Sequence, residues 1–490
     1  MSKTSRRKFL QAGAGIAAVS ASSTSVSAST AKNERPRNVL FIGVDDLNTS
    51  LHCYGDPTVH TPNLDRLAAR GVRCDADYCQ YPLCSPSRSS LLTGLAPDTT
   101  GIYGNRTHFR QNIPDVVTLP ELFRKNGYFS ARVGKIFHYG NPEEIGTDGL
   151  DDPVSWNYTY NPCGVDRLKD EPLVTNYTPN RGKGGRLGSS IAFYPAPSPD
   201  EEITDAIGAK EVIRLLGEKH QDPFFIAFGL YRPHVPWIVP RPYFDRYPID
   251  TIQAKPFDPS ELKIAPPPAY WTQPPNFGMN EMQRREAIRG YYAATTFMDA
   301  QVGKVLTALE TLGLADNTLV VFWVDHGWQF GQHGQWMKQT LFEHATRVPL
   351  IFAGAGVPVQ GGVIRHTVEH LDIYPTVAEL CGLKAPENLH GQSLARILKN
   401  PNEVWSKPAV TQVARPGGPD PQIMGYSIRT DRYRFTSWQD GYAGEELYDY
   451  QNDPRELNNL ADDPKMHRTK FILQKALNTI TATRGKNRHP

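Results

Sequence analysis

The sequence has 490 residues, of which 39% are hydrophobic and 21% are charged, and its formal net charge is +2. This length and composition support a sizeable core and exclude a disordered chain. Without Lys3, Arg6, Arg7 and Lys8, the remaining 49 basic residues face 51 acidic ones, which excludes a basic protein that binds nucleic acid.

The N-terminus resembles an export signal. Ser5–Leu10 (SRRKFL) is a twin-arginine pattern, residues 11–20 are weakly apolar, and Val26–Ala28 fits a cleavage site. The alternative is a disordered basic tail. The apolar stretch is too short to span a bilayer. We therefore predict that residues 1–30 are a twin-arginine signal peptide. The mature protein would be exported to the bacterial periplasm or beyond, with no membrane span.

Predicted strands and helices then alternate along the chain. Asn38–Val44 (NVLFIGV) is almost continuously apolar, which is typical of a buried parallel strand. Thr61 as N-cap and Pro62 in the first turn predict a helix that ends at Gly71. Further predicted strands are 224–230, 318–324 and 349–353, and further predicted helices are 118–126, 201–218, 281–312 and 369–382. The pattern predicts an α/β domain whose large, mostly parallel sheet is flanked by helices on both faces.

Two segments interrupt this alternation. Residues 140–200 and 232–280 are rich in Pro, Gly, Asn and Tyr, and both follow strand ends, where α/β enzymes carry ligand-binding loops. We predict that they form the walls of a substrate pocket, although plain surface loops would have a similar composition.

The character of the sequence changes after about residue 400. A hairpin is expected over 426–436, a strand over 446–449 and a helix over 464–482. We therefore predict a main catalytic domain over 36–400 and a small α+β C-terminal subdomain over 401–490.

Acidic residues follow two of the buried strands. Asp45 and Asp46 come after the first strand, and Asp325 and His326 follow the strand at 318–324. Adjacent carboxylates are a costly arrangement unless a cation lies between them. A helix cap or a turn explains either pair alone equally well. The two pairs together favour one shared divalent metal, with Ca²⁺ or Mg²⁺ preferred over zinc because oxygen ligands dominate.

A second candidate site is Cys84-Ser85-Pro86-Ser87-Arg88. Pro86 suits a first helical turn, so Cys84 is expected at a helix N-terminus, where free N–H groups and the helix dipole favour an anion. Arg88 lies about one turn later and is placed to reach back to a tetrahedral oxyanion. The alternatives are a buried structural cysteine and a thiolate nucleophile.

The other five cysteines fit no zinc-binding spacing. They are expected to be buried thiols or members of structural disulfides: Cys53, Cys74, Cys79, Cys163 and Cys381.

Cys-x-Pro-Ser-Arg followed by Leu-Thr-Gly resembles the signature of type I sulfatases, in which the cysteine is oxidised to formylglycine (3-oxoalanine). Further blocks over roughly 37–460 agree in order: VDDLNTSLHCYGD, TPNLDRLAARG, LAPDTTGIYG, VGKIFH, YRPHVPW and VDHGWQFGQHGQWMK. The aspartate–histidine pair, RPHVPW and GQHGQWMK are most similar to the iduronate-2-sulfatase branch. The resemblance implies an alkaline-phosphatase-like sandwich, a C-terminal subdomain with an antiparallel sheet, and sulfuric ester hydrolase activity on a sulfated carbohydrate.

The resemblance also implies how the metal is held. The ligands to Ca²⁺, or to Mg²⁺ in its place, would be Asp45, Asp46, the modified Cys84, Asp325 and His326. A formylglycine-generating enzyme would be a partner during maturation.

The remaining candidates have catalytic roles by the same resemblance. Arg88 would steady the formylglycine hydrate, with Lys135 and His138 beside it, while His234 and Lys338 would contact the sulfate and the leaving oxygen. A hydrate oxygen would attack sulfur, His234 would protonate the leaving alcohol, and His138 would take the proton that lets sulfate leave. Each residue has a plain alternative as a surface charge or a loop cap.

His333 and Trp336 are expected either to lie behind these residues and support them or to form the pocket wall. A 2-O-sulfated uronic acid from a glycosaminoglycan or algal polysaccharide, cleaved at a chain end, fits the resemblance. The alternatives are a phosphodiesterase or phosphonate monoester hydrolase of the same superfamily and a non-catalytic glycan-binding homologue.

Overall fold

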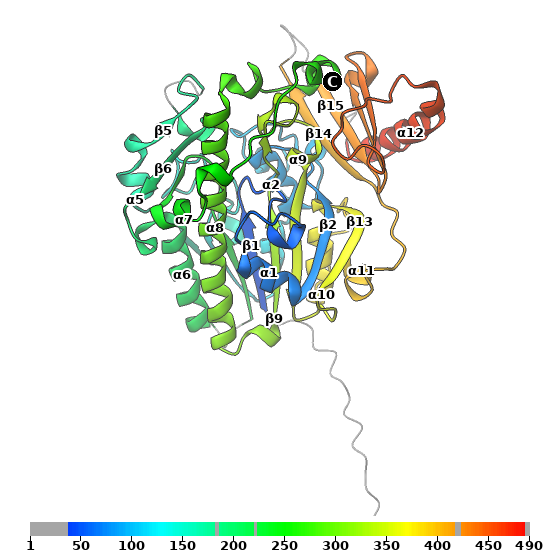
Figure 1. Cartoon of the computed structure of the whole chain (residues 1–490). Helices are drawn as coiled ribbons and strands as arrows, with labels where there is room; N and C mark the ends of the chain where they lie inside the picture. The colour runs from blue at the N-terminus through cyan, green and yellow to red at the C-terminus, as the bar shows by residue number, and fades with distance from the viewer. Residues whose placement is uncertain (1–37, 182–185, 220–222, 417–422, 486–490) are drawn as a thin grey trace, which may run out of the picture. The chain divides into compact units, whose positions relative to one another are not determined.

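An eight-stranded sheet forms the centre of the fold (Figure 1), with strand order β13-β2-β12-β9-β1-β7-β3-β4. The computed structural model describes residues 38–181, 186–219, 223–416 and 423–485, so the predicted signal peptide lies outside the described residues. The strands are β1 (Asn38–Val44), β2 (Gly71–Tyr78), β3 (Phe129–Gly134), β4 (Tyr158–Tyr160), β7 (Phe224–Gly229), β9 (Thr318–Val324), β12 (Arg347–Gly354) and β13 (Gly362–Glu369). Within this sheet β12 is antiparallel to both neighbours, and the other pairs are parallel.

The central strands are apolar along their whole length because both faces of the sheet are covered. Every residue of β1, β7 and β9 is buried. Leu40 and Ile42 of β1 belong to one hydrophobic cluster, whereas Val39 and Phe41 belong to the other. The predicted strands and the mostly parallel sheet are confirmed.

Two groups of helices supply the two clusters. The first cluster contains residues of α1 (Pro62–Ala69), α6 (Thr204–Lys219) and α8 (Glu281–Thr311). The second contains residues of α2 (Cys84–Thr93), α4 (Leu119–Lys125), α10 (Ile373–Leu380) and α11 (Ala395–Lys399). The predicted helices are present, but the one predicted over 369–382 is shorter, because its first turn is a separate 3₁₀ segment at His370–Asp372.

The start of α1 differs from the prediction in how it is capped. The helix does begin at Pro62, but the Thr61 side chain makes no capping hydrogen bond and instead accepts from the N–H of His52 at 3.2 Å. Asp299 of α8 caps α1 from outside: its two carboxylate oxygens accept from the N–H groups of Asn63 (3.2 Å) and Leu64 (2.8 Å). The cap therefore comes from a neighbouring helix. The helix ends at Ala69, and Gly71 is already the first residue of β2.

The C-terminal part forms an antiparallel four-stranded sheet in the order β14-β15-β16-β17. Its elements are β14 (Ala409–Arg415), β15 (Ile423–Arg429), β16 (Tyr433–Trp438), β17 (Glu445–Asp449) and α12 (His467–Thr483). The predicted hairpin, third strand and helix are confirmed. Arg434 of β16 donates to Glu343 at 2.6 Å, which ties this sheet to the segment before β12. The boundary between 36–400 and 401–490 remains our proposal.

Shorter strands and helices lie in the segments that connect the main elements. A three-stranded sheet joins β5 (Thr175–Asn176), β6 (Ala192–Ala196) and β8 (Trp237–Pro240), and a short hairpin joins β10 (Gln329–Phe330) and β11 (Trp336–Met337). The short helices are α3 (Pro97–Thr100), α5 (Val165–Leu168), α7 (Arg241–Asp245) and α9 (Glu343–Thr346). Among the described residues, no helix combines the length and apolar character needed to cross a membrane.

Candidate active site

The carboxyl ends of β1 and β9 bring the two acidic pairs together. The strands are parallel neighbours with Val44 opposite Val324, so the residues that follow each strand meet at one edge of the sheet. The N–H of Asp46 donates to Oδ1 of Asp325 at 3.1 Å. Asp46 has φ 62°, a left-handed conformation that turns the chain away from the strand direction. All of these aspartates are fully buried.

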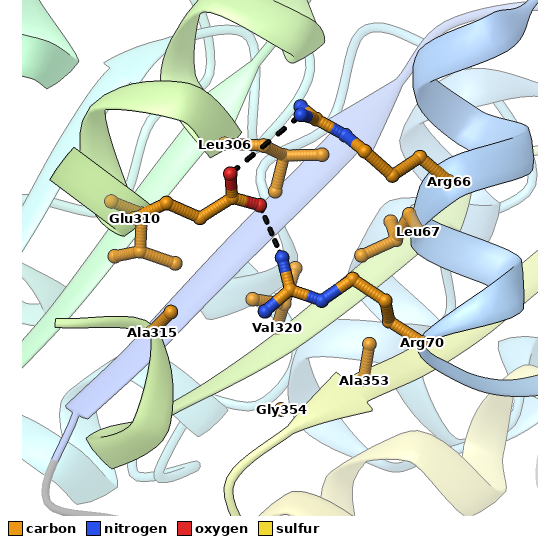
Figure 2. A pocket seen from close by; sticks show the side chains of 10 residues that line it. Arg66, Leu67, Arg70, Leu306, Glu310, Ala315, Val320, Ala353 and Gly354 are labelled. Carbon is orange, nitrogen blue, oxygen red and sulfur yellow. Dashed lines mark hydrogen bonds and ion pairs between the residues drawn. The ribbon is translucent and has the colours of Figure 1, made fainter. Parts of the chain in front are cut away.

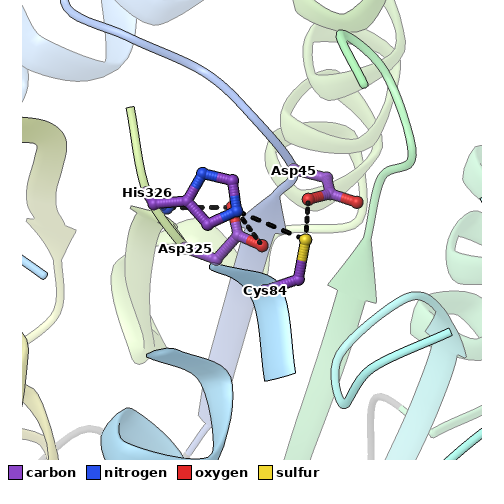
Figure 3. Close-up of side chains that lie close together, drawn as sticks. All are labelled: Asp45, Cys84, Asp325 and His326. Atoms are coloured by element: carbon purple, nitrogen blue, oxygen red, sulfur yellow. Dashed lines mark hydrogen bonds and ion pairs between the residues drawn. The ribbon is translucent and has the colours of Figure 1, made fainter. Parts of the chain in front are cut away.

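Cys84 is the first residue of α2, as predicted, and its thiol points into this cluster (Figure 3). Sγ lies 3.4 Å from Oδ1 of Asp45 and 3.3 Å from Nε2 of His326. The residue before it, Leu83, is extended and supplies no side-chain cap. The N-terminus of a buried helix therefore faces a group of carboxylates.

Two lysines approach the same point from other loops. Nζ of Lys338, which follows β11, donates to Oδ1 of Asp46 at 2.6 Å and to Sγ of Cys84 at 3.2 Å. Lys135, which follows β3, pairs with Oδ2 of Asp45. Burial raises the pKa of the Cys84 thiol, but the charges of Lys338, Lys135 and His326 outweigh burial and hold this pKa well below its ordinary value. The site therefore favours negative charge at position 84.

Arg88 is fully buried, and its guanidinium points at the aspartates and at main-chain carbonyls. Nε donates to Oδ2 of Asp325 at 2.8 Å. Nη1 donates to the carbonyls of Lys135 (2.7 Å) and Ile136 (3.0 Å), and Nη2 donates to the carbonyl of Val44 at 3.3 Å. Arg88 thus joins the ends of β1, β3 and β9 under the cluster.

Two of the predicted histidines also reach the cluster. Nδ1 of His234 lies 2.6 Å from the carbonyl of Val235 and donates to it, so Nε2 faces Oδ2 of Asp46 at 3.6 Å. His138 is buried beside Cys84, and its Nδ1 has no hydrogen-bond partner among the described residues. Both rings therefore present a nitrogen for further contacts.

The donor set fits a divalent cation. Single ligand atoms from Asp45, Cys84, Asp325 and His326 lie within 4.8 Å of one another, and so do those of Asp45, Asp46, Cys84 and His234. Oδ2 of Asp46 is buried without a hydrogen-bond donor among the described residues, whereas Oδ2 of Asp45 has the ammonium of Lys135 as its partner. Such oxygens are costly to bury unless a cation compensates them.

His326 is oriented as a metal ligand would be. Its Nδ1 lies 3.2 Å from the carbonyl of Gly327, so Nε2 faces the carboxylates. Burial lowers the pKa of His326, but the negative charges around it, led by the Asp325 carboxylate, together outweigh burial and raise the pKa to about 9. A bound cation would replace that proton.

A pocket of about 280 Å³ opens beside the cluster. Its walls include His138, Asn141, Arg181, His234, Trp271 and Lys338. Most of these residues come from segments 140–200 and 232–280, so the two loops predicted to form pocket walls do line a pocket next to the cluster.

A second crevice lies between α1, α8 and the strand ends of β9 and β12 (Figure 2). It contains no candidate residue, and its charges pair with one another: Nη1 of Arg66 lies 3.6 Å from Oε2 of Glu310, and Arg70 also pairs with Glu310.

The structure places three residues in ways that the sequence did not predict. Tyr291 of α8 was not predicted, yet its Oη donates to the carbonyl of Asp46 and accepts from the N–H of Asn48, both at 2.8 Å. Nothing in a helical sequence marks such a tyrosine. His333 lines a separate crevice with Lys255, and Trp336 is buried and donates to Asn276, so neither lines the pocket beside Lys338.

All six cysteines are free thiols, so the disulfide alternative for the other five does not apply in this structure.

Comparison with known proteins agrees with this arrangement. A family model described as "Sulfatase" matches residues 37–383, and one described as "N-sulphoglucosamine sulphohydrolase, C-terminal" matches residues 331–483. A "Sulfatase" from Formosa agariphila is 35% identical over 90% of this chain and 86% of its own length. Iduronate 2-sulfatase from Mus musculus is 33% identical over 87% of this chain and 91% of its own length.

Solved structures share the fold. The phosphonate monoester hydrolase of Agrobacterium radiobacter superposes with a TM-score of 0.75 at 23% identity, covering 92% of this chain and 96% of that one. Solved sulfatases also align over most of the chain. The alkaline-phosphatase-like sandwich with a C-terminal antiparallel sheet is thus confirmed.

Proposed function

Since this chain belongs to the sulfatase family and is a hydrolase of sulfate esters, we propose that it removes an O-sulfate group from a sulfated carbohydrate through a formylglycine made from Cys84. The observation that carries this proposal is the position of Cys84: its Sγ lies at a helix N-terminus, 3.2 Å from Nζ of Lys338 and 3.4 Å from Oδ1 of Asp45. A modified side chain there would meet both the lysines and the metal ligands.

The metal would be held by Asp45, Asp46, Asp325, His326 and the modified residue 84. When present, formylglycine in its hydrated form would supply a hydroxyl nucleophile, and the divalent cation would supply positive charge for the sulfate oxygens. Ca²⁺ is our proposal for the ion, because carboxylate oxygens dominate the donor set.

The chain's own residues would perform the remaining steps. Lys135 and Lys338 place two positive charges beside position 84, where they would stabilise the oxygens of a bound sulfate. His234 keeps Nδ1–H on a carbonyl, so a proton on Nε2 makes it an imidazolium that can protonate the leaving alcohol. The unpartnered Nδ1 of the buried His138 is available to accept a proton. Arg88 would hold the carboxylates and the residue-84 oxygens in place.

The 33% identity to iduronate 2-sulfatase over most of both chains supports a 2-O-sulfated uronic acid at a chain end as the substrate. The pocket has walls from two loops, which suits a terminal sugar better than the middle of a polymer. Release of sulfate from internal positions of an intact polysaccharide would contradict this part of the proposal.

Two experiments test the function. Mass spectrometry of the Cys84 peptide from the native host should show sulfur replaced by oxygen with loss of two hydrogens, and a persistent thiol would overturn the formylglycine mechanism. Sulfate release from a 2-O-sulfated uronate disaccharide should exceed hydrolysis of phosphonate and phosphate diesters, with Cys84→Ala as the inactive control. Faster phosphonate hydrolysis would favour the phosphonate hydrolase alternative, and tight sugar binding without turnover would favour a glycan-binding homologue.

We also propose that residues 1–30 direct export through a twin-arginine signal. Cell fractionation and N-terminal sequencing of the mature protein should find it outside the cytoplasm, beginning after Ala28. Replacement of Arg6 and Arg7 by Lys should retain the protein in the cytoplasm, and unchanged export would contradict the proposal.

A further inference from the structure

Arg181 lies in the wall of the pocket beside Lys338, and part of its guanidinium makes no hydrogen bond to the described residues. Nε donates to the carbonyl of Ser189 at 2.8 Å, and Cζ lies 3.9 Å from the centre of the Phe277 ring. These two contacts hold the guanidinium plane in place. Within the described ranges no carboxylate lies at ion-pair distance from Arg181, and neither of its Nη atoms donates a hydrogen bond.

This arginine differs from the arginines in the crevice of Figure 2. Arg66 and Arg70 both pair with Glu310, so their charges are compensated within the protein. Arg181 is half-buried without such a partner, and burial alone lowers its pKa to about 10. A partly desolvated guanidinium whose fork faces a pocket is a favourable site for an anion.

Asn141 supplies a second, independent observation in the same pocket. Its side chain is 4% exposed, yet neither Oδ1 nor Nδ2 has a hydrogen-bond partner among the described residues. Burying an amide without partners is costly, so an amide left open in a pocket wall points to a ligand that completes it. An amide both donates and accepts, which matches a sugar hydroxyl.

The two residues share one structural support. Gly188 packs so closely on Asn141 that an added Cβ would lie 2.0 Å from its carbonyl oxygen, and the next residue, Ser189, accepts the hydrogen bond from Arg181. One turn therefore places both side chains in the same wall. Glu143 and Glu144 also line the pocket, but both are exposed, and Oε2 of Glu144 accepts from the N–H of Gly140 at 2.6 Å.

We propose that Arg181 and Asn141 form a specificity subsite that selects sulfated sugars carrying a second anionic group. Arg181 binds the second anion with its free Nη edge, and Asn141 hydrogen-bonds a hydroxyl of the same sugar. The inference rests on the proposed function, because it assigns the scissile sulfate to the cluster around Cys84. The second anion is a carboxylate or a second sulfate, since both accept two parallel hydrogen bonds from a guanidinium.

Three substrates test the subsite: a sulfated uronic acid, a disulfated neutral sugar and a monosulfated neutral sugar. Arg181→Gln should lower kcat/KM for the sugars with a second anion by about ten- to a hundredfold, mainly through KM, and leave the monosulfated sugar nearly unchanged. Asn141→Ala should raise KM for all three. The sulfated uronic acid and the disulfated neutral sugar are then compared with each other. The one that wild type turns over faster, and whose turnover Arg181→Gln lowers more, shows whether the second anion is a carboxylate or a sulfate. Equal losses on all three sugars with Arg181→Gln, or none, would overturn the proposal.

A binding measurement separates this inference from the proposed function. Calorimetry on Cys84→Ala and on Cys84→Ala/Arg181→Gln should show tighter binding of the dianionic sugars only where Arg181 is present. That result would support the subsite even if wild type hydrolyses none of the sugars, in which case the proposed function alone fails. Equal affinities in the two variants would refute the subsite. Arg66→Gln, outside the pocket, is the matched control, and thermal unfolding checks that each variant folds.

Discussion

Nε of Arg88 donates to Oδ2 of Asp325 at 2.8 Å, and neither side chain has any exposed surface. The pair joins α2 to the end of β9, and Asp325 is itself one of the proposed metal ligands. A charge buried at this depth depends on its partner, because water cannot replace the lost interaction.

Removal of this arginine should therefore destabilise the protein. Arg88→Gln is expected to lower the free energy of unfolding by about 3 kcal/mol, because it takes the guanidinium away from a fully buried carboxylate and from three main-chain carbonyls. Urea unfolding followed by circular dichroism measures this loss. The control is Arg66→Gln, whose partly exposed ion pair should contribute less than about 1 kcal/mol. Equal losses in the two variants would show that the buried pair contributes no more to the free energy of unfolding than the partly exposed one.

Lys338 should matter for turnover more than for folding. Lys338→Met retains much of the side-chain length but removes the charge beside Cys84, and kcat should fall by about 10²- to 10³-fold. Lys338→Arg keeps the charge in a different geometry and should recover only part of the activity. Steady-state kinetics with a sulfated sugar tests both variants. Full activity of Lys338→Met would exclude this lysine from the reaction.

Metal removal should lower thermal stability, because a cation bound only to the folded state stabilises it by roughly 2.7 kcal/mol at a concentration one hundred times its Kd. Differential scanning calorimetry before and after treatment with EDTA should show a lower Tm, restored by Ca²⁺ or Mg²⁺. Asp46→Asn should abolish most of this response, since it removes a carboxylate whose Oδ2 lacks a donor among the described residues. A wild-type Tm that does not change after treatment with EDTA would contradict the metal site.

Asp299 predicts a pH dependence of stability away from the active site. Burial raises the pKa of Asp299 to about 6, although hydrogen bonds from Leu64 and Asn63 oppose burial. Between about pH 4 and pH 6 the folded protein therefore holds a proton that the unfolded chain has lost. This contribution to the free energy of unfolding should decline as pH rises through that range and stay level above it.

Asp299→Asn removes the titrating group and should lack this slope. It should also cost about 1 kcal/mol near neutral pH, because the amide nitrogen replaces one of the two oxygens that accept the hydrogen bonds capping α1. Urea unfolding at several pH values measures both effects. Parallel pH profiles for wild type and variant would contradict the assignment.

The sequence by itself determined the main strands and helices and the positions of the candidate active-site residues along them. Continuous apolar runs such as Asn38–Val44 predicted buried strands, and Pro86 predicted the helix that starts at Cys84. Asp45 and Asp325 could be placed together because carboxyl ends of neighbouring parallel strands share one sheet edge. These signals are local, since periodicity and capping depend on residues close in the chain.

Only the tertiary structure decided which distant groups meet. Asp299 caps a helix by accepting from Asn63, 236 positions away from it, where the sequence suggested Thr61. Arg181 and Asn141 lie in loops without periodicity, and their unpaired donors and acceptors become visible only when every neighbouring partner is known. Burial and charge compensation are properties of the packed molecule: the same arginine is a solvated charge in an isolated loop and an anion-binding group in the wall of a pocket.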